Sequence, residues 1–193
     1  MAAHFNLPNA LTWLRIVLVP LLVVLFYLPW PWSDQAAGLL FAVAGITDAF
    51  DGYFARKLNM TSRLGAFLDP VADKLIVAVA LVLLISKNAH WYLVLTACVI
   101  IGREIAISAL REWMAEIGAR GKVAVSTMGK IKTILQIVGL SMMLFAGGQM
   151  DYLLIVFPIY WIGLALIVVS AVLTLWSMIL YLRAAWPDLA ARS

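Results

Sequence analysis

Six long apolar segments, separated by short polar breaks, restrict the fold of this chain more than any other feature of its sequence. A helix rises 1.5 Å per residue, so about 20 apolar residues cross the hydrocarbon core of a bilayer. Hydrophobic residues make up 65% of the 193 residues and charged residues 12%, whereas soluble domains average about 25% charged. The sequence therefore predicts an all-α integral membrane protein with six transmembrane helices, in a single domain over residues 1–193. The approximate segments are 10–29, 36–56, 64–86, 91–111, 123–147 and 152–182.

The distribution of Lys and Arg predicts which side of the membrane each break faces. The second and fourth breaks and the C-terminal tail are rich in these residues, whereas the first, third and fifth breaks contain only Lys87. Cytoplasmic loops are enriched in Lys and Arg, so both termini are expected on the cytoplasmic side. Near the N-terminus, "NLPNALTWLRI" is predicted to begin as a short interfacial helix. The net charge of +4 then reflects orientation and anionic headgroups, and no nucleic-acid partner is expected.

Four aspartates interrupt the apolar pattern within a short stretch: Asp48, Asp51, Asp69 and Asp73. Charged side chains are costly in hydrocarbon, so they usually serve a function there. Asp48 and Asp51 have helical i, i+3 spacing near the end of the second segment. Asp69 and Asp73 have i, i+4 spacing in the third segment. Because the connector is short, the two segments are expected to be antiparallel neighbours whose acidic faces meet near the cytoplasmic surface.

Four facing carboxylates repel strongly in a low-dielectric site, unless some are protonated or cations neutralise them. An oxygen-only ligand set suits hard divalent cations, and the single cysteine and two histidines lack the spacing of a zinc site. Two divalent cations balance four carboxylates, and such pairs promote displacement at phosphorus. Two structural alternatives are that Asp69 caps a helix beginning at Pro70 and that Asp73 pairs with Lys74.

Acidic residues inside a membrane also mark ion or proton pathways, so a small transporter is an alternative to an enzyme. Against it, the acids cluster at one membrane face, and the fifth and sixth segments contain none. A non-catalytic scaffold is a third alternative, but it has no need for four facing aspartates.

The spacing of these residues resembles the complete signature of the CDP-alcohol phosphatidyltransferases. The signature reads Asp48-x2-Asp51-Gly52-x2-Ala55-Arg56-x8-Gly65-x3-Asp69-x3-Asp73. Longer stretches, including "GAFLDPVADK" and "GREIAISALREWMAEIG", are similar to the bacterial members that make phosphatidylglycerophosphate.

This resemblance implies transfer of a phosphatidyl group from CDP-diacylglycerol to sn-glycerol 3-phosphate with release of CMP, the committed step toward phosphatidylglycerol and cardiolipin. It also implies two Mg²⁺ or Mn²⁺ ions and a homodimer in the bacterial cytoplasmic membrane. In the family pattern the four aspartates surround the metals, and Asp73 is also the base. The pocket for the cytidine diphosphate is lined by Gly52, Ala55, Arg56 and Gly65.

Four basic residues are predicted to hold the phosphate of the acceptor: Arg103, Arg111, Lys130 and Lys132. Arg suits bidentate contact with phosphate and Lys acts as a point charge. The alternative for Arg111 is that it marks the cytoplasmic interface, and the alternative for Arg103 is a pair with Glu104.

Overall fold

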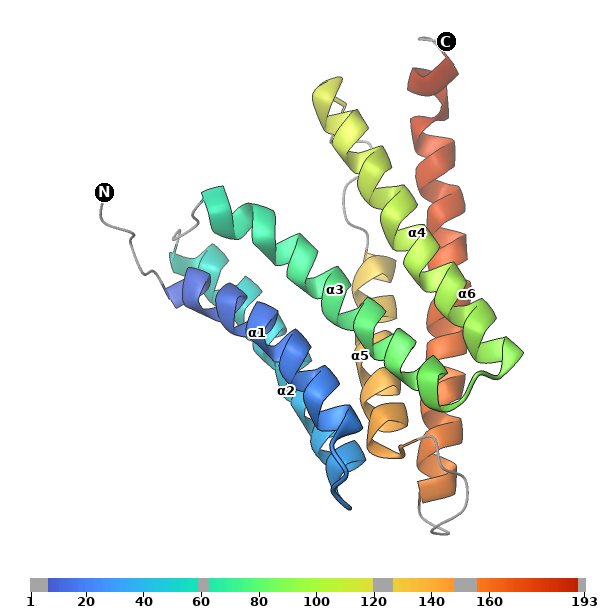
Figure 1. The fold of residues 1–193 in the computed structure, drawn as a ribbon. Helices are drawn as coiled ribbons and strands as arrows, with labels where there is room; N and C mark the ends of the chain where they lie inside the picture. Colours follow the sequence, from blue (N-terminus) through green and yellow to red (C-terminus); the bar gives the residue numbers. More distant parts are fainter. Residues whose placement is uncertain (1–6, 59–62, 120–126, 148–155, 191–193) are drawn as a thin grey trace.

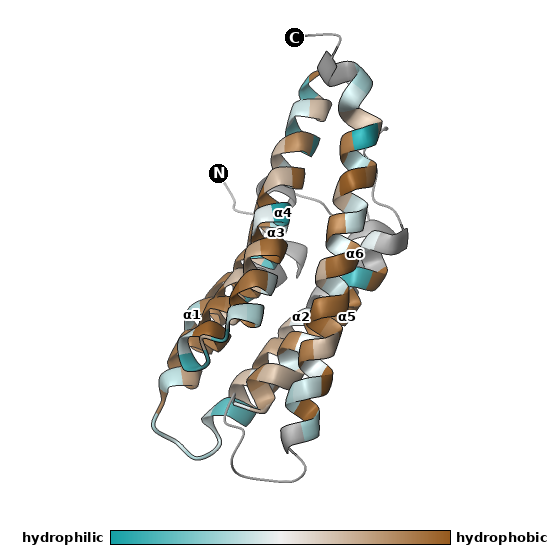
Figure 2. Ribbon diagram, turned by 90° about the vertical axis from the view of Figure 1, so that its right-hand side faces the viewer, coloured by the Kyte–Doolittle hydropathy of each residue, from teal (hydrophilic) through white to brown (hydrophobic). Residues whose placement is uncertain are grey.

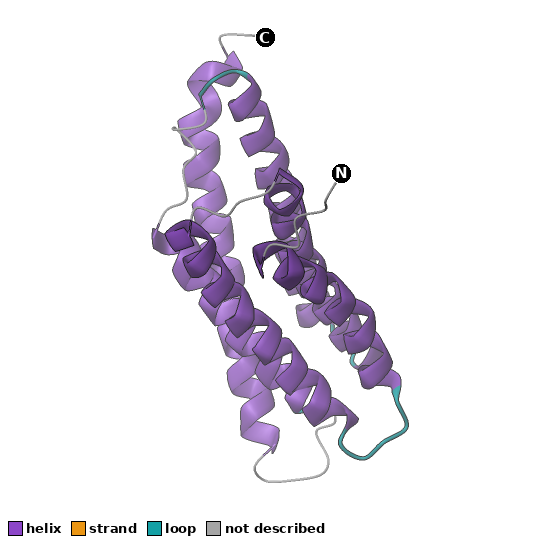
Figure 3. Cartoon of the chain, turned by 90° about the vertical axis from the view of Figure 1, so that its left-hand side faces the viewer, coloured by secondary structure: helices purple, strands orange, loops and turns teal. Residues whose placement is uncertain are grey.

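The computed structural model describes residues 7–58, 63–119, 127–147 and 156–190. These residues form six helices and no strand (Figure 3). The helices are α1 (Leu7–Tyr27), α2 (Ser33–Leu58), α3 (Arg63–Lys87), α4 (Trp91–Glu116), α5 (Thr127–Phe145) and α6 (Val156–Ala190). The predicted all-α fold with six helices is confirmed, and each helix covers most of the corresponding apolar segment.

The helix ends differ from the prediction where hydropathy is a poor guide. From Leu7 onward, α1 is one continuous helix, so the described residues contain no separate interfacial helix before it. The C-terminal end of α4 also differs: the helix continues past residue 111, where the sequence predicted the segment to end, and stops where Gly118 takes a positive φ of 76°. There the Ala119 N–H donates to the Met114 carbonyl at 2.8 Å, a closing bond typical of helix C-termini. A charged turn ends an apolar segment, but it does not end a helix.

Helix α1 packs against both α2 and α3, while α2 also packs against α5 (Figure 1). Along the described residues, α2 and α3 do not form an extensive interface with each other, and most of the acidic side chains that were predicted to meet lie outside the described residues, so that meeting stays a prediction. The large side chains of Leu22 and Phe26 on α1 are buried in the same core cluster as two small residues, Ala44 on α2 and Ala80 on α3. Small residues allow close approach of helices, so α1 packs against both α2 and α3 along their apolar parts.

The second half of the bundle is organised around the close contact of α5 with α6. A Cβ atom added to Gly139 would lie 2.8 Å from the Gly163 carbonyl oxygen, and the reverse distance is the same. Helix α6 packs in turn against α4.

Among the described residues, two helical segments are long and apolar enough to cross a membrane: Trp91–Glu116 and Pro158–Pro187. Shorter apolar helical stretches lie at Trp13–Tyr27 and Ile131–Phe145. Apolar residues make up much of the helices (Figure 2), and many of their large side chains are exposed, which suits contact with lipid better than contact with water. With 35 residues, α6 is about 52 Å long, and it extends beyond a hydrocarbon core of about 30 Å.

Candidate functional site

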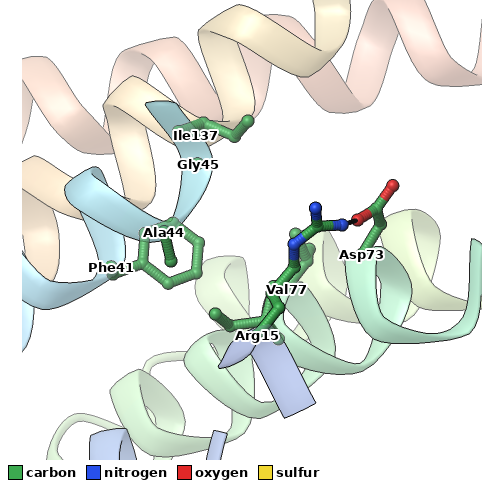
Figure 4. Close-up of a pocket in the computed structure, with 8 residues that line it drawn as sticks. Arg15, Phe41, Ala44, Gly45, Asp73, Val77 and Ile137 are labelled. Atoms are coloured by element: carbon green, nitrogen blue, oxygen red, sulfur yellow. Dashed lines mark hydrogen bonds and ion pairs between the residues drawn. The ribbon is translucent and has the colours of Figure 1, made fainter. Parts of the chain in front are cut away.

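A cavity lies where four helices converge (Figure 4). It contains about 300 Å³ of unfilled space, a volume that includes its open mouth. Its walls are Arg15 from α1, Phe41, Ala44 and Gly45 from α2, Asp73, Ile76 and Val77 from α3, and Ile137 from α5. Helices α2 and α3 therefore face each other across this cavity, and Asp73 lies on the side opposite Phe41 and Gly45.

The charged groups of the cavity are an ion pair between Arg15 Nη1 and Asp73 Oδ1. The Arg15 side chain is only 5% exposed, while that of Asp73 is 44% exposed. Burial of the cation behind the carboxylate fixes Asp73 at the cavity wall and leaves it accessible. The site prediction omitted Arg15, although a lone arginine in an apolar segment is itself a signal of function.

The other three predicted metal ligands lie on the same pair of helices. Asp48 and Asp51 are in the C-terminal part of α2, and Asp69 is one turn before Asp73 in α3. Their side chains lie outside the described residues, so their roles stay predictions. The same holds for Gly52, Ala55, Arg56, Gly65 and Lys130.

Two structural alternatives for the aspartates fail. Helix α3 begins at Arg63 and contains Pro70, so Asp69 does not cap a helix that starts there. Lys74 donates to Ser108 Oγ on α4 in place of the predicted pair with Asp73. Among the described side chains, which exclude those of Asp48, Asp51 and Asp69, no three His, Cys, Asp or Glu residues gather as metal ligands.

A second charged group is buried between α4, α5 and α6. Glu104 Oε1 accepts hydrogen bonds from Arg103 Nη1 at 2.7 Å and from Lys132 Nζ at 2.5 Å. Arg103 Nη2 also donates to Ser177 Oγ on α6 at 2.8 Å. The structure therefore confirms the alternative pairing of Arg103 with Glu104, and it adds Lys132 to the same carboxylate.

Tyr181 extends this cluster toward Arg111. Arg111 Nη2 donates to the Tyr181 hydroxyl at 3.3 Å. The guanidinium carbons of Arg111 and Arg103 lie 5.4 Å and 5.9 Å from the centroid of the Tyr181 ring, within the range of cation–π attraction. Three of the four predicted phosphate-binding residues are thus gathered around Glu104 and Tyr181. We call this group, Arg103, Glu104, Arg111, Lys132, Ser177 and Tyr181, the basic cluster.

The cavity and the basic cluster are joined through consecutive residues of α3. Asp73 lines the cavity, and the next residue, Lys74, donates to Ser108 on α4. Ser108 Oγ in turn donates to the Glu104 carbonyl oxygen at 2.6 Å. The accessible carboxylate of Asp73 is thus next in sequence to Lys74, whose contacts lead through Ser108 to Glu104 and the buried cations that pair with it. Such an arrangement suits a reaction in which a proton is removed from an anionic substrate.

A six-helix bundle with an apolar exterior and charged groups buried between its helices is a multi-pass membrane protein. The chain belongs to the CDP-alcohol phosphatidyltransferase family, whose sequence profile matches residues 5–176. It is 51% identical over 189 residues to the CDP-diacylglycerol–glycerol-3-phosphate 3-phosphatidyltransferase of Escherichia coli (strain K12). It is 50% identical to the protein of the same name from Salmonella choleraesuis (strain SC-B67). Both alignments cover 96% of this chain and 98% of the relative.

Membership of this family confirms the predicted resemblance and identifies the chain as a phosphatidyltransferase, not a transporter or a scaffold. Sequence reasoning missed Ser177 and Tyr181 of the basic cluster. They belong to a buried polar stripe on α6 with i, i+4, i+7, i+11 spacing, formed by Ser170, Thr174, Ser177 and Tyr181. That stripe is readable in the sequence of an otherwise apolar helix, so it was an available signal.

Proposed function

We propose that the protein transfers the phosphatidyl group of CDP-diacylglycerol to sn-glycerol 3-phosphate, giving phosphatidylglycerophosphate and CMP. This is the committed step toward phosphatidylglycerol and cardiolipin. The observation that carries the proposal is identity of 50–51% across 96% of the chain to relatives named for this reaction. The buried cations Arg103 and Lys132 support it, because the acceptor is a phosphate monoester and needs positive partners.

Two divalent cations, Mg²⁺ or Mn²⁺, are the cofactors in this proposal, held by Asp48, Asp51, Asp69 and Asp73. The residues suit them: the donor set is all oxygen, and Asp73 is 44% exposed on a cavity wall. The other three carboxylates lie on the same two helices, which line that cavity. When bound, the cations supply charge stabilisation to the phosphoryl group and to the departing CMP.

Asp73 is the proposed base. It takes the proton of the glycerol hydroxyl as the hydroxyl oxygen forms a bond to the β-phosphorus of CDP-diacylglycerol. The bond between that phosphorus and the oxygen of CMP breaks, and CMP leaves with the bonding pair. A carboxylate that is ionised by a neighbouring cation is a weak base, but the hydroxyl becomes more acidic as its bond to phosphorus forms. Arg15 holds Asp73 at the cavity wall for this step.

The remaining predicted residues hold the two substrates. Gly52, Ala55, Arg56 and Gly65 line the pocket for the cytidine diphosphate, where small residues allow close approach to the helix backbone. The acceptor phosphate is held by Arg111 and Lys130, together with Arg103 and Lys132. We propose that the enzyme is a homodimer in the bacterial inner membrane, with both termini in the cytoplasm.

The test is an acceptor panel with the purified protein in detergent micelles. CMP release and the lipid product are measured with glycerol 3-phosphate, serine, inositol phosphate and choline as acceptors. We expect turnover with glycerol 3-phosphate alone, loss of turnover when EDTA removes divalent cations, and recovery with Mg²⁺ or Mn²⁺. Turnover with another acceptor in preference would refute the proposed substrate, and full activity in EDTA would refute the metals.

A further inference from the structure

Glu104 lies where an anionic substrate group would otherwise meet the two buried cations of the basic cluster. Its Oε1 atom accepts from both Arg103 Nη1 and Lys132 Nζ. The cation side chains are 6% and 7% exposed, while the Glu104 side chain is 26% exposed. The carboxylate is therefore the more accessible partner, and a ligand that approaches these cations meets Glu104 first.

The basic cluster also has hydrogen-bonding capacity that Glu104 does not use. The Nε atoms of Arg103 and Arg111 are buried and have no hydrogen-bond partner in the described structure. A buried N–H without an acceptor costs free energy, so it points to a group that binds there. One carboxylate also balances only one of the two charges of Arg103 and Lys132.

We propose that Glu104 is an internal counter-ion that the phosphate of the acceptor displaces from Arg103 and Lys132, and that this exchange selects phosphorylated acceptors. The proposal rests on the function proposed above. A phosphate monoester carries close to two negative charges at neutral pH and has three acceptor oxygens, so it competes well with a single carboxylate. A neutral polyol such as glycerol brings no charge, so it leaves the Glu104 contacts in place.

The alternative is that Glu104 is a permanent structural ion pair. Both roles predict that loss of its charge destabilises the protein, because two buried cations then lack a counter-ion. Only the exchange role predicts that free phosphate replaces the missing charge and that the acceptor binds more tightly without Glu104.

The experiment compares the wild-type protein with Glu104→Gln and with Glu112→Gln, which removes an exposed carboxylate from the same helix. The first readout is the thermal unfolding midpoint with and without inorganic phosphate. We expect Glu104→Gln to have a lowered midpoint that phosphate largely restores, with a much smaller phosphate effect in the wild type and in Glu112→Gln. An equal phosphate effect in all three proteins would overturn the proposal.

The second readout is kinetic. We expect the KM for glycerol 3-phosphate to fall about fivefold or more in Glu104→Gln, with the KM for CDP-diacylglycerol unchanged. An unchanged or higher KM for glycerol 3-phosphate would show that Glu104 is structural. If Glu104→Gln does not fold, Glu104→Asp replaces it, because the shorter carboxylate cannot reach both cations at once. It should then show a smaller fall in the same KM, and an unchanged KM would overturn the proposal.

The two proposals fail in distinguishable ways. A wild-type protein that does not use glycerol 3-phosphate refutes the proposed function. Active wild-type protein with no difference between Glu104→Gln and Glu112→Gln refutes the exchange alone. The phosphate-dependent unfolding midpoint requires no turnover at all.

Discussion

Asp73 is ion-paired and yet accessible, a combination that a purely structural carboxylate in an apolar helix does not need. The buried Arg15 holds one oxygen atom of its carboxylate, and the side chain remains 44% exposed at the cavity. In the family pattern the residue is both a metal ligand and the base, and these two roles predict different defects on substitution.

Replacing Asp73 with Asn should damage chemistry more than substrate capture. Asn keeps the volume and can still accept a hydrogen bond from Arg15, but it cannot take a proton. Loss of a positioned base typically costs about 10²–10⁴ in rate, so we expect a fall of that order in kcat. The measurement is single-turnover CMP release beside direct binding of CDP-diacylglycerol.

Glu116→Gln is the matched control, since it neutralises an exposed carboxylate and should leave both values unchanged. If Asp73→Asn instead loses metal binding and CDP-diacylglycerol binding together, while the bound complex reacts at the wild-type rate, the base is another group.

Arg111 tests where the acceptor phosphate binds. Its guanidinium group contacts Tyr181, and its buried Nε has no hydrogen-bond partner among the described residues. Arg111→Ala should raise the KM for glycerol 3-phosphate about ten- to a hundred-fold, the loss expected for one charge-assisted hydrogen bond. Lys130→Ala should do the same. Arg183→Ala, which removes an exposed arginine from α6, should leave this KM unchanged. Unchanged KM values in Arg111→Ala and Lys130→Ala would locate the phosphate elsewhere.

At the scale of elements, the contact between α5 and α6 holds the basic cluster together, because Lys132 is on α5 and Ser177 and Tyr181 are on α6. The Ser170 hydroxyl of α6 donates to the Lys132 carbonyl oxygen at 3.0 Å. Gly139 and Gly163 allow the two backbones to approach closely enough for these contacts.

Gly139→Ala should therefore destabilise the protein. The new Cβ would lie 2.8 Å from the Gly163 carbonyl oxygen and from Ile167 Cγ1, so the helices must separate. Overpacking of this kind costs about 1–3 kcal/mol, which thermal unfolding in detergent would detect as a lowered midpoint. At Gly102, nothing lies within 4 Å of an added Cβ. Gly102→Ala should accordingly be neutral or stabilising by up to about 1 kcal/mol. Equal midpoints for the two variants would mean that the α5–α6 contact is less tight than described.

At the scale of the whole molecule, six helices that alternate in direction bring the start of α1 and the end of α6 to the same end of the bundle (Figure 1). The end of α2 and the start of α3 lie toward that end too, whereas the end of α3, at Lys87, lies at the other. The excess of Lys and Arg in the second and fourth breaks and the C-terminal tail predicts that this end is cytoplasmic. That all six helices belong to one domain stays a prediction.

A reporter fused after Ser193 tests this orientation. A fluorescent protein that folds only in the cytoplasm should be bright there, and a phosphatase that is active only in the periplasm should be inactive. The same reporters fused after Lys87 should behave in the opposite way, which controls for their expression. A dark fluorescent protein and an active phosphatase in the C-terminal fusions would reverse the predicted topology.

The sequence by itself determined the six helices and their apolar exterior, because hydropathy and helical periodicity are properties of neighbouring residues. It also marked Asp73 and Arg103, since charges stand out against an apolar segment. The tertiary structure alone decided that α1 packs against both α2 and α3, that Arg15 pairs with Asp73, and that Lys132 joins Arg103 at Glu104. These contacts join residues from different helices. Their distances depend on how large and small side chains pack, and no local pattern encodes that packing.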